Sequence, residues 1–196
     1  MNQLDETSVN IYKTAGWLSI TSAILAIPLS VITIIQMLKR SSGRILAPFS
    51  IILLLLTVVL GLYAFYKFRD LLNRKYDFHK VDTLITIVIL GSILMTCERV
   101  LFRLIYPAAM VPMLVLIVAT GIPLSIVGIM FAARLLELND DLNGLLKPLA
   151  YTYMVACIMF LTIILSDFGH IALIAFHVML GIALIRSGRE SLPEFV

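Results

Sequence analysis

Long apolar segments alternate with short polar segments along the whole chain. Most of the apolar segments hold roughly 20 residues, the length an α-helix needs to cross the hydrocarbon core of a bilayer. The pattern predicts six spans, at about residues 14–38, 45–65, 83–106, 110–133, 148–165 and 168–185. We therefore expect an all-α fold, a polytopic membrane bundle of six transmembrane helices in a single domain of residues 1–196.

The boundary between the fifth and sixth spans rests on very few residues. Only Ser166, Asp167 and Gly169 interrupt the apolar run from 148 to 185. A single helix over that range would be far longer than a bilayer needs, so a tight hairpin is favoured. A lower count of spans would require one segment to be re-entrant.

Composition supports a lipid environment. The chain is 61% hydrophobic and 14% charged, whereas soluble domains carry about 25% charged residues. The net charge is +3, and the basic residues fall in short clusters between the spans, which is typical of anchoring at lipid headgroups. The expected partners are the lipid bilayer and either other membrane subunits or a homo-oligomer, and no nucleic acid.

The distribution of basic residues predicts the orientation, because cytoplasmic loops are enriched in lysine and arginine. With a cytoplasmic N-terminus, ten basic residues lie inside and five outside. The inside set is Lys13, Lys67, Arg69, Arg74, Lys75, Lys80, Arg134, Lys147, Arg186 and Arg189, and the outside set is Lys39, Arg40, Arg44, Arg99 and Arg103. Both termini are therefore expected in the cytoplasm, although the loop from Lys39 to Arg44 runs against the rule.

Two polar connections carry a helical pattern. Apolar residues share one face over 68–76, and leucines recur at helical spacing over 135–145. Each segment is either an interfacial helix lying along the headgroups or an extension of the preceding transmembrane helix.

Short matches suggest an internal repeat. The segment Ile27–Val31 (IPLSV) resembles Ile122–Ile126 (IPLSI), and Pro48 opens the second span much as Pro148 opens the fifth. A repeat of three spans would be inverted, a transporter design that places binding near the midplane. A competing alignment pairs Gly61, Lys67, Asp70 and Lys80 with Gly128, Arg134, Glu137 and Lys147, but the positive-inside rule already explains those basic residues.

Polar residues in the third span are candidates for a cavity, because ionisable groups inside a membrane are costly. Ser92, Thr96, Arg99 and Arg103 recur at i, i+4, i+7 and i+11 and form one stripe, with Glu98 about 100° away from Arg99. The stripe would line a water-filled cavity or bind an anionic group. The competing interpretation is that these side chains extend to the interface from the end of the span.

Asp167, His170 and His177 form a second candidate site at the start of the sixth span, for a proton or a ligand. The histidines are seven residues apart and share a face, and Asp167 is placed to orient His170. Both cannot ligate opposite sides of one haem, and His79 lies in a loop, so only a haem shared across a dimer stays open. The competing interpretation is a pair of hydrogen-bonded histidines that pack helices together.

Other chemistry is not indicated. Cys97 and Cys157 lie in separate apolar segments without zinc spacing. A calcium-like run begins at Asn139 but has Ala150 where a bidentate glutamate is required. Motifs of metalloproteases, serine hydrolases and nucleotide-binding proteins are absent. We expect no enzyme and no cofactor, and the sequence assigns no metal.

The sequence thus predicts a small multi-pass membrane protein that binds or translocates a small solute, or serves as a membrane subunit of a larger complex. A redox or proton-handling protein using His170 and His177 is the first alternative. A structural scaffold is the second. No residue pattern identifies a known family.

Overall fold

Six α-helices make up the computed structural model, which describes residues 6–38, 43–105, 110–138, 142, 144–162 and 166–189, with side chains within 10–32, 35, 48–101, 115–138, 142, 144–162 and 168–188. They are α1 (Glu6–Leu38), α2 (Gly43–Tyr76), α3 (Asp82–Ile105), α4 (Met110–Leu135), α5 (Leu146–Leu161) and α6 (Ser166–Arg189). Five are long and apolar enough to cross a membrane, and α5 is a shorter apolar helix. The prediction of an all-α membrane bundle is confirmed.

The helices form because the spans are rich in aliphatic residues and because backbone groups in hydrocarbon must bond within the segment. Charged residues near the helix ends complement the helix dipole. Asp82 begins α3, Arg74 and Lys75 lie in the last turn of α2, and Arg134 lies in the last turn of α4. These residues mark where each helix meets the polar surroundings.

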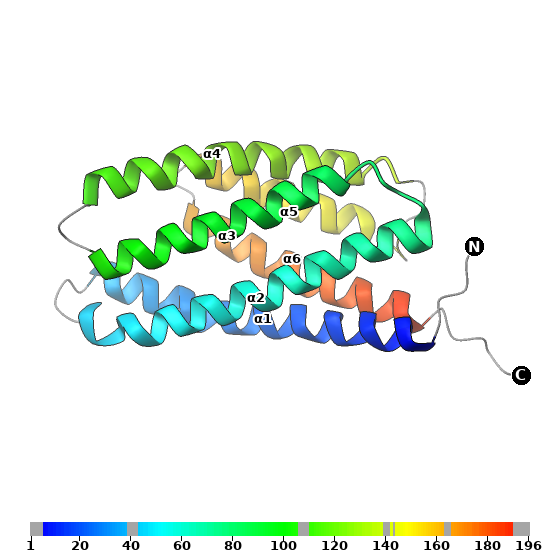
Figure 1. The fold of residues 1–196 in the computed structure, drawn as a ribbon, viewed down its shortest axis with the longest axis horizontal. Helices are drawn as coiled ribbons and strands as arrows, with labels where there is room; N and C mark the ends of the chain where they lie inside the picture. Colours follow the sequence, from blue (N-terminus) through cyan, green and yellow to red (C-terminus); the bar gives the residue numbers. More distant parts are fainter. Residues whose placement is uncertain are drawn as a thin grey trace, which may run out of the picture.

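The six helices form a closed ring in chain order, with successive helices antiparallel (Figure 1). The most extensive contact joins α1 to α6 and closes the ring. A Cβ atom at Gly16 would lie 2.6 Å from the carbonyl oxygen of Gly181, and one at Gly181 would lie 2.6 Å from that of Gly16. The closure therefore depends on two glycines that bring the two backbones together.

We call one end of the bundle the base. It carries the start of α1, the end of α6 and the turns that join α2 to α3 and α4 to α5 (Figure 1). Much of the hydrophobic core lies in this half and includes the fully buried side chains of Phe68, Leu71, Leu72, Leu135 and Leu149. The base is therefore packed much like a soluble helix bundle.

Four buried aromatic rings occupy the interior next to this core. Phe65, Phe131, Tyr153 and Phe176 come from α2, α4, α5 and α6, and the centroids of contacting rings are 4.6 to 5.8 Å apart. Tilted and edge-on contacts of this kind stabilise a packed core. The rings fill the centre of the bundle at this level.

Residues 68–76 extend α2 rather than form a separate interfacial helix, because α2 continues to Tyr76. Phe68, Leu71 and Leu72 face the bundle core. Lys67 lies over the rings of Tyr63 and Tyr66, 5.9 and 5.3 Å from their centroids. A basic residue beside tyrosines is typical of a membrane interface, which places the last turns of α2 beyond the apolar layer.

The described residues of the second connection do not form an interfacial helix either. After Leu135, the described residues of the connection form turns, in which Leu142 has a positive φ of 44° and Gly144 one of 77°. The Leu142 side chain is buried in the core, so the leucine pattern reflects packing onto the bundle. The first ligand positions of the calcium-like run, Asn139, Asp141 and Asn143, lie outside the described residues.

The α5–α6 hairpin ends short of the other helices at the end opposite the base (Figure 1). α5 has 16 residues, which corresponds to about 24 Å at 1.5 Å per residue. The inverted repeat would pair α5 with α2, which has 34 residues. The two lengths do not match, and the repeat stays a prediction.

Candidate functional site

His177 lies where α1, α2 and α6 meet. The Ser19 hydroxyl donates to the His177 carbonyl oxygen at 2.8 Å and lies 3.4 Å from the ring atom Nδ1. The ring faces Gly61 of α2, where an added Cβ would be 3.0 Å from its Cε1 atom. His177 therefore bonds to α1 through its carbonyl oxygen, and its ring packs against α2 at Gly61.

His170 faces different neighbours. Its ring packs edge-on against Phe160 of α5, with centroids 5.0 Å apart, and it is under the electrostatic influence of Arg99 from α3. The side chain of Asp167 lies outside the described residues, so its expected role toward His170 stays a prediction. The structure therefore brings Arg99 near His170 but directs His170 and His177 to different helices.

Part of the predicted polar stripe on α3 forms a hydrogen bond within the helix itself. The Thr96 hydroxyl donates to the Ser92 carbonyl oxygen at 2.6 Å, a bond within the helix. Arg99 is half-buried, and the side chain of Arg103 lies outside the described residues. Within the part that is described, the bond of Thr96 therefore stays within α3.

Among the predicted candidates whose side chains are described, Glu98 has the smallest exposed fraction, 3%. Its Oε2 atom accepts a hydrogen bond from the Thr120 hydroxyl of α4 at 2.8 Å. The same hydroxyl lies 3.0 Å from the Leu116 carbonyl oxygen and 3.3 Å from that of Ile117. A carboxyl group among apolar side chains is costly unless it is bonded, so the Glu98–Thr120 pair is a candidate site.

A groove of about 280 Å³ runs between α3 and α4 beside this pair. Its walls are Ile87, Gly91, Leu94, Ala119, Thr120, Pro123, Leu124 and Val127. Ile87 and Leu94 are 41% and 52% exposed, so the groove faces outward toward the surrounding lipid. Thr120 belongs to both the wall and the pair, which connects an apolar groove to a buried carboxyl group.

The helical repeat explains this connection. Ile87, Gly91, Leu94 and Glu98 stand at i, i+4, i+7 and i+11 and therefore share one face of α3. Glu98 thus continues the α3 wall beyond Leu94, on the side away from the base. The sequence pointed to Glu98 but gave no sign of Thr120, because α4 is apolar on every side.

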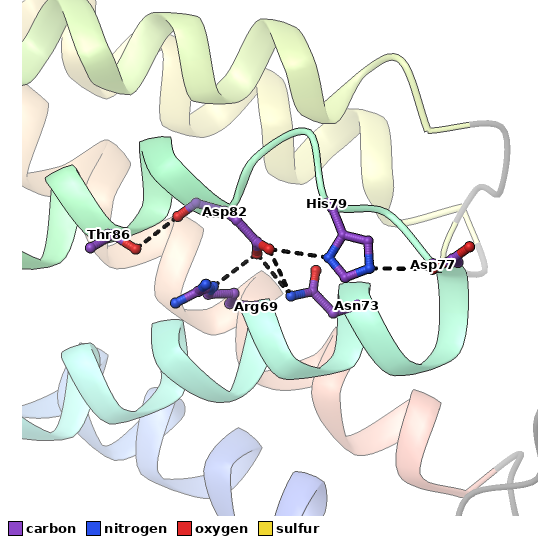
Figure 2. A network of polar contacts seen from close by, with 6 residues as sticks. All are labelled: Arg69, Asn73, Asp77, His79, Asp82 and Thr86. Atoms are coloured by element: carbon purple, nitrogen blue, oxygen red, sulfur yellow. Dashed lines mark hydrogen bonds and ion pairs between the residues drawn. The ribbon is translucent and has the colours of Figure 1, made fainter.

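A polar network at the base was not predicted (Figure 2). Asp82 accepts hydrogen bonds from Arg69 Nε at 2.8 Å and from Asn73 Nδ2 at 2.8 and 3.0 Å, and it lies 3.2 Å from His79 Nδ1. His79 Nε2 faces Asp77 at 3.2 Å. The hydrogen bond to Asp82 raises the pKa of His79 above its usual value. These contacts cap α3 and fix the turn that joins it to α2.

A second set of ion pairs connects that turn to α4. Glu137 accepts from Lys80 Nζ at 3.1 Å and from Arg134 Nη1 at 2.7 Å. The hydrogen bond from Lys80 lowers the pKa of Glu137. Together, the contacts of Asp82 and Glu137 hold the base ends of α3 and α4, the two helices that line the groove.

Metal ligation has no support in this geometry. Among the residues that the structure describes, no three histidine, cysteine or acidic side chains lie together as a metal site would require. Cys97 is exposed and Cys157 buried, and both are free thiols. Among the described residues, the Glu98–Thr120 pair joins a buried carboxyl group to an apolar groove and is the candidate binding site.

Comparison with known proteins gives no match, whether to a family model, a curated protein or a solved structure.

Proposed function

We propose that this multi-pass membrane protein is a non-enzymatic binding protein that takes a small amphiphilic molecule from the bilayer into the α3–α4 groove. One observation carries the proposal: an outward-facing apolar groove meets a buried carboxyl–hydroxyl pair at Thr120. Small-molecule sites typically combine apolar walls with a few placed polar groups. The volume of about 280 Å³ suits a narrow ligand with one chain.

The polar pair supplies the selectivity in this proposal. An alkyl chain gains little from leaving lipid, because lipid tails are as apolar as the groove walls. Binding then depends on close packing along the walls and on hydrogen bonding at the Glu98–Thr120 end. A purely apolar molecule would therefore bind weakly.

The packed interior of the bundle favours binding at the α3–α4 groove over translocation of a solute through the centre of the ring. The aromatic cluster of Phe65, Phe131, Tyr153 and Phe176 occupies the centre of the bundle. A proton-handling function would need His170 and His177 on a shared path, yet they contact different helices. The role of other membrane subunits or of a homo-oligomer stays a prediction.

Photoaffinity labelling tests the proposal. The protein in phosphatidylcholine nanodiscs is irradiated with dodecanol that carries a diazirine on its chain, and labelled residues are mapped by mass spectrometry. We expect saturable labelling on α3 and α4. Ala119→Phe, which fills the groove from an exposed position, should reduce it at least about tenfold, the effect of 1.4 kcal/mol of lost binding.

Val59→Phe is the matched control, because Val59 is an exposed residue of α2 away from the groove. It should leave the labelling of α3 and α4 unchanged. Labelling that does not saturate, or that Ala119→Phe leaves intact, would contradict the proposal and favour a scaffold.

We also propose that the base faces the cytoplasm. Many basic residues lie at that end, among them Lys67, Lys75, Lys80, Lys147 and Arg186, as the positive-inside rule favours. A Lys147→Cys variant in a cysteine-free background should react with a membrane-impermeant maleimide only after cell lysis. Reaction in intact cells would reverse the orientation.

A further inference from the structure

We infer that the α3–α4 groove selects a single-chain amphiphile whose head is a protonated amine, and that Glu98 binds that head. The inference rests on the proposed function and names the class of ligand. It follows from the position of Glu98, from the bonding options of Thr120 and from the chemistry of the carboxyl group.

The position of Glu98 matches the orientation of an amphiphile in a leaflet. Glu98 lies about 16 Å along α3 from Ile87, at 1.5 Å per residue. The groove lines α3 from Ile87, near the base, to Leu94, at the middle of the helix, and Glu98 lies one turn beyond Leu94 on the side away from the base. A head at Glu98 would therefore lie on the side of α3 away from the base, with its chain along Leu94 and Gly91 toward the base.

Thr120 can release Glu98 at little cost. Its hydroxyl carries one proton but has three acceptors in reach: Glu98 Oε2 at 2.8 Å, the Leu116 carbonyl oxygen at 3.0 Å and the Ile117 carbonyl oxygen at 3.3 Å. When the hydroxyl turns to a backbone carbonyl, it keeps a hydrogen bond. The Glu98 oxygen is then open to an N–H donor that enters through the groove wall.

The sign of the charge selects the head. A carboxylate in an apolar site is stabilised most by a cation that also donates hydrogen bonds. A protonated amine provides both, a hydroxyl provides one neutral hydrogen bond, and a carboxylate head brings a second acid group without a cation to pair with it. Glu98 bonds to Thr120 of α4, and Arg99 stands about 100° further around α3.

A competition experiment tests the inference on the full chain in phosphatidylcholine nanodiscs at neutral pH. Dodecylamine, dodecanol and dodecanoate compete with the diazirine probe for labelling of α3 and α4. We expect dodecylamine to compete about tenfold better than dodecanol, the change that 1.4 kcal/mol produces. Dodecanoate should be the weakest competitor.

Glu98→Gln is the informative variant, because glutamine keeps the size of the side chain and an acceptor for Thr120. The amine and the alcohol should compete equally in this variant, while labelling itself persists. Ser125→Ala is the control, since the Ser125 hydroxyl bonds within α4 to the Gly121 carbonyl oxygen, and it should retain the preference for the amine. Thermal unfolding of each variant verifies folding.

The outcomes separate the two proposals. Suppose that the unsubstituted protein is labelled and that Ala119→Phe abolishes this labelling. If dodecylamine then has no advantage over dodecanol, or keeps its advantage in Glu98→Gln, the amine inference is wrong but binding in the groove is supported. If the groove is not labelled at all, both are wrong.

Discussion

The closure of the ring between α1 and α6 can be tested by adding a single carbon atom. In Gly16→Ala, the new Cβ would lie 2.6 Å from the carbonyl oxygen of Gly181 and 2.6 Å from Cγ1 of Ile185. A side-chain end can turn aside, but a carbonyl oxygen within a helix cannot. The two helices have to separate, and α1–α6 is the most extensive interface of the bundle.

The size of the effect follows from a comparison with a second glycine. Overpacking of this kind costs about 1–3 kcal/mol, while alanine has the higher helix propensity by up to about 1 kcal/mol. Gly121→Ala gains the same propensity, but its added Cβ would meet only the Met95 Cε atom at 3.5 Å. Gly16→Ala should therefore be less stable than Gly121→Ala by about 1–3 kcal/mol.

Reversible unfolding in mixed micelles measures this difference. Circular dichroism follows the helices, and Trp17, the only tryptophan, reports on α1. The double variant Gly16→Ala/Gly181→Ala should lose less than the sum of the single losses, because the first substitution already separates the helices. Equal stability of Gly16→Ala and Gly121→Ala would refute the close approach.

Three further substitutions test contacts elsewhere in the bundle. The pKa of His79 is raised by Asp82, so its stabilising contribution should be present at acidic pH and lost as the pH rises through the folded-state pKa. Thermal unfolding from pH 5 to 9 should show this loss of stability in the unsubstituted protein and not in His79→Ala. The pKa of Glu137 is lowered from its ordinary value of 4.5, so its contribution should be present at neutral pH and lost as the pH falls through the folded-state value. Glu137→Gln should remove that acid-side loss when thermal unfolding is followed below pH 4.5. Ser19→Ala removes the bond to the His177 carbonyl oxygen and should cost about 0.6 kcal/mol, the average for such bonds between membrane helices; an unchanged unfolding free energy would show that the bond adds nothing.

The helices were predictable because the thickness of the bilayer fixes the length of an apolar span. The placement of residues 68–76 was not predictable, because an interfacial helix and a helix packed onto a core have the same apolar period. Leu71 and Leu72 belong to one buried core that also contains Phe78 and Leu142, from the two turns at the base. That core joins segments that are far apart in the sequence.

The site was predictable in part for a related reason. A glutamate in an apolar span is conspicuous, so Glu98 was a candidate from the sequence. Its partner Thr120 was not, since the rotation of a helix that is apolar on all sides leaves no periodic signal. The ion pair of Asp82 with Arg69 was not predictable, because the positive-inside rule accounts for a basic residue at this position without an acidic partner.

The distribution of packing explains why binding belongs between α3 and α4. In water, apolar burial holds helices together, but within lipid that driving force is lost, and association depends on close packing and hydrogen bonds. At the base, a buried core and the ion pairs of Asp82 and Glu137 hold α3 and α4 in place. Away from the base, a hydrogen bond from Thr120 to Glu98 joins α4 to α3 beside the groove. A ligand that takes over this bond gains a polar contact while the fold stays anchored at the base, so the bundle can bind there without reorganising its core.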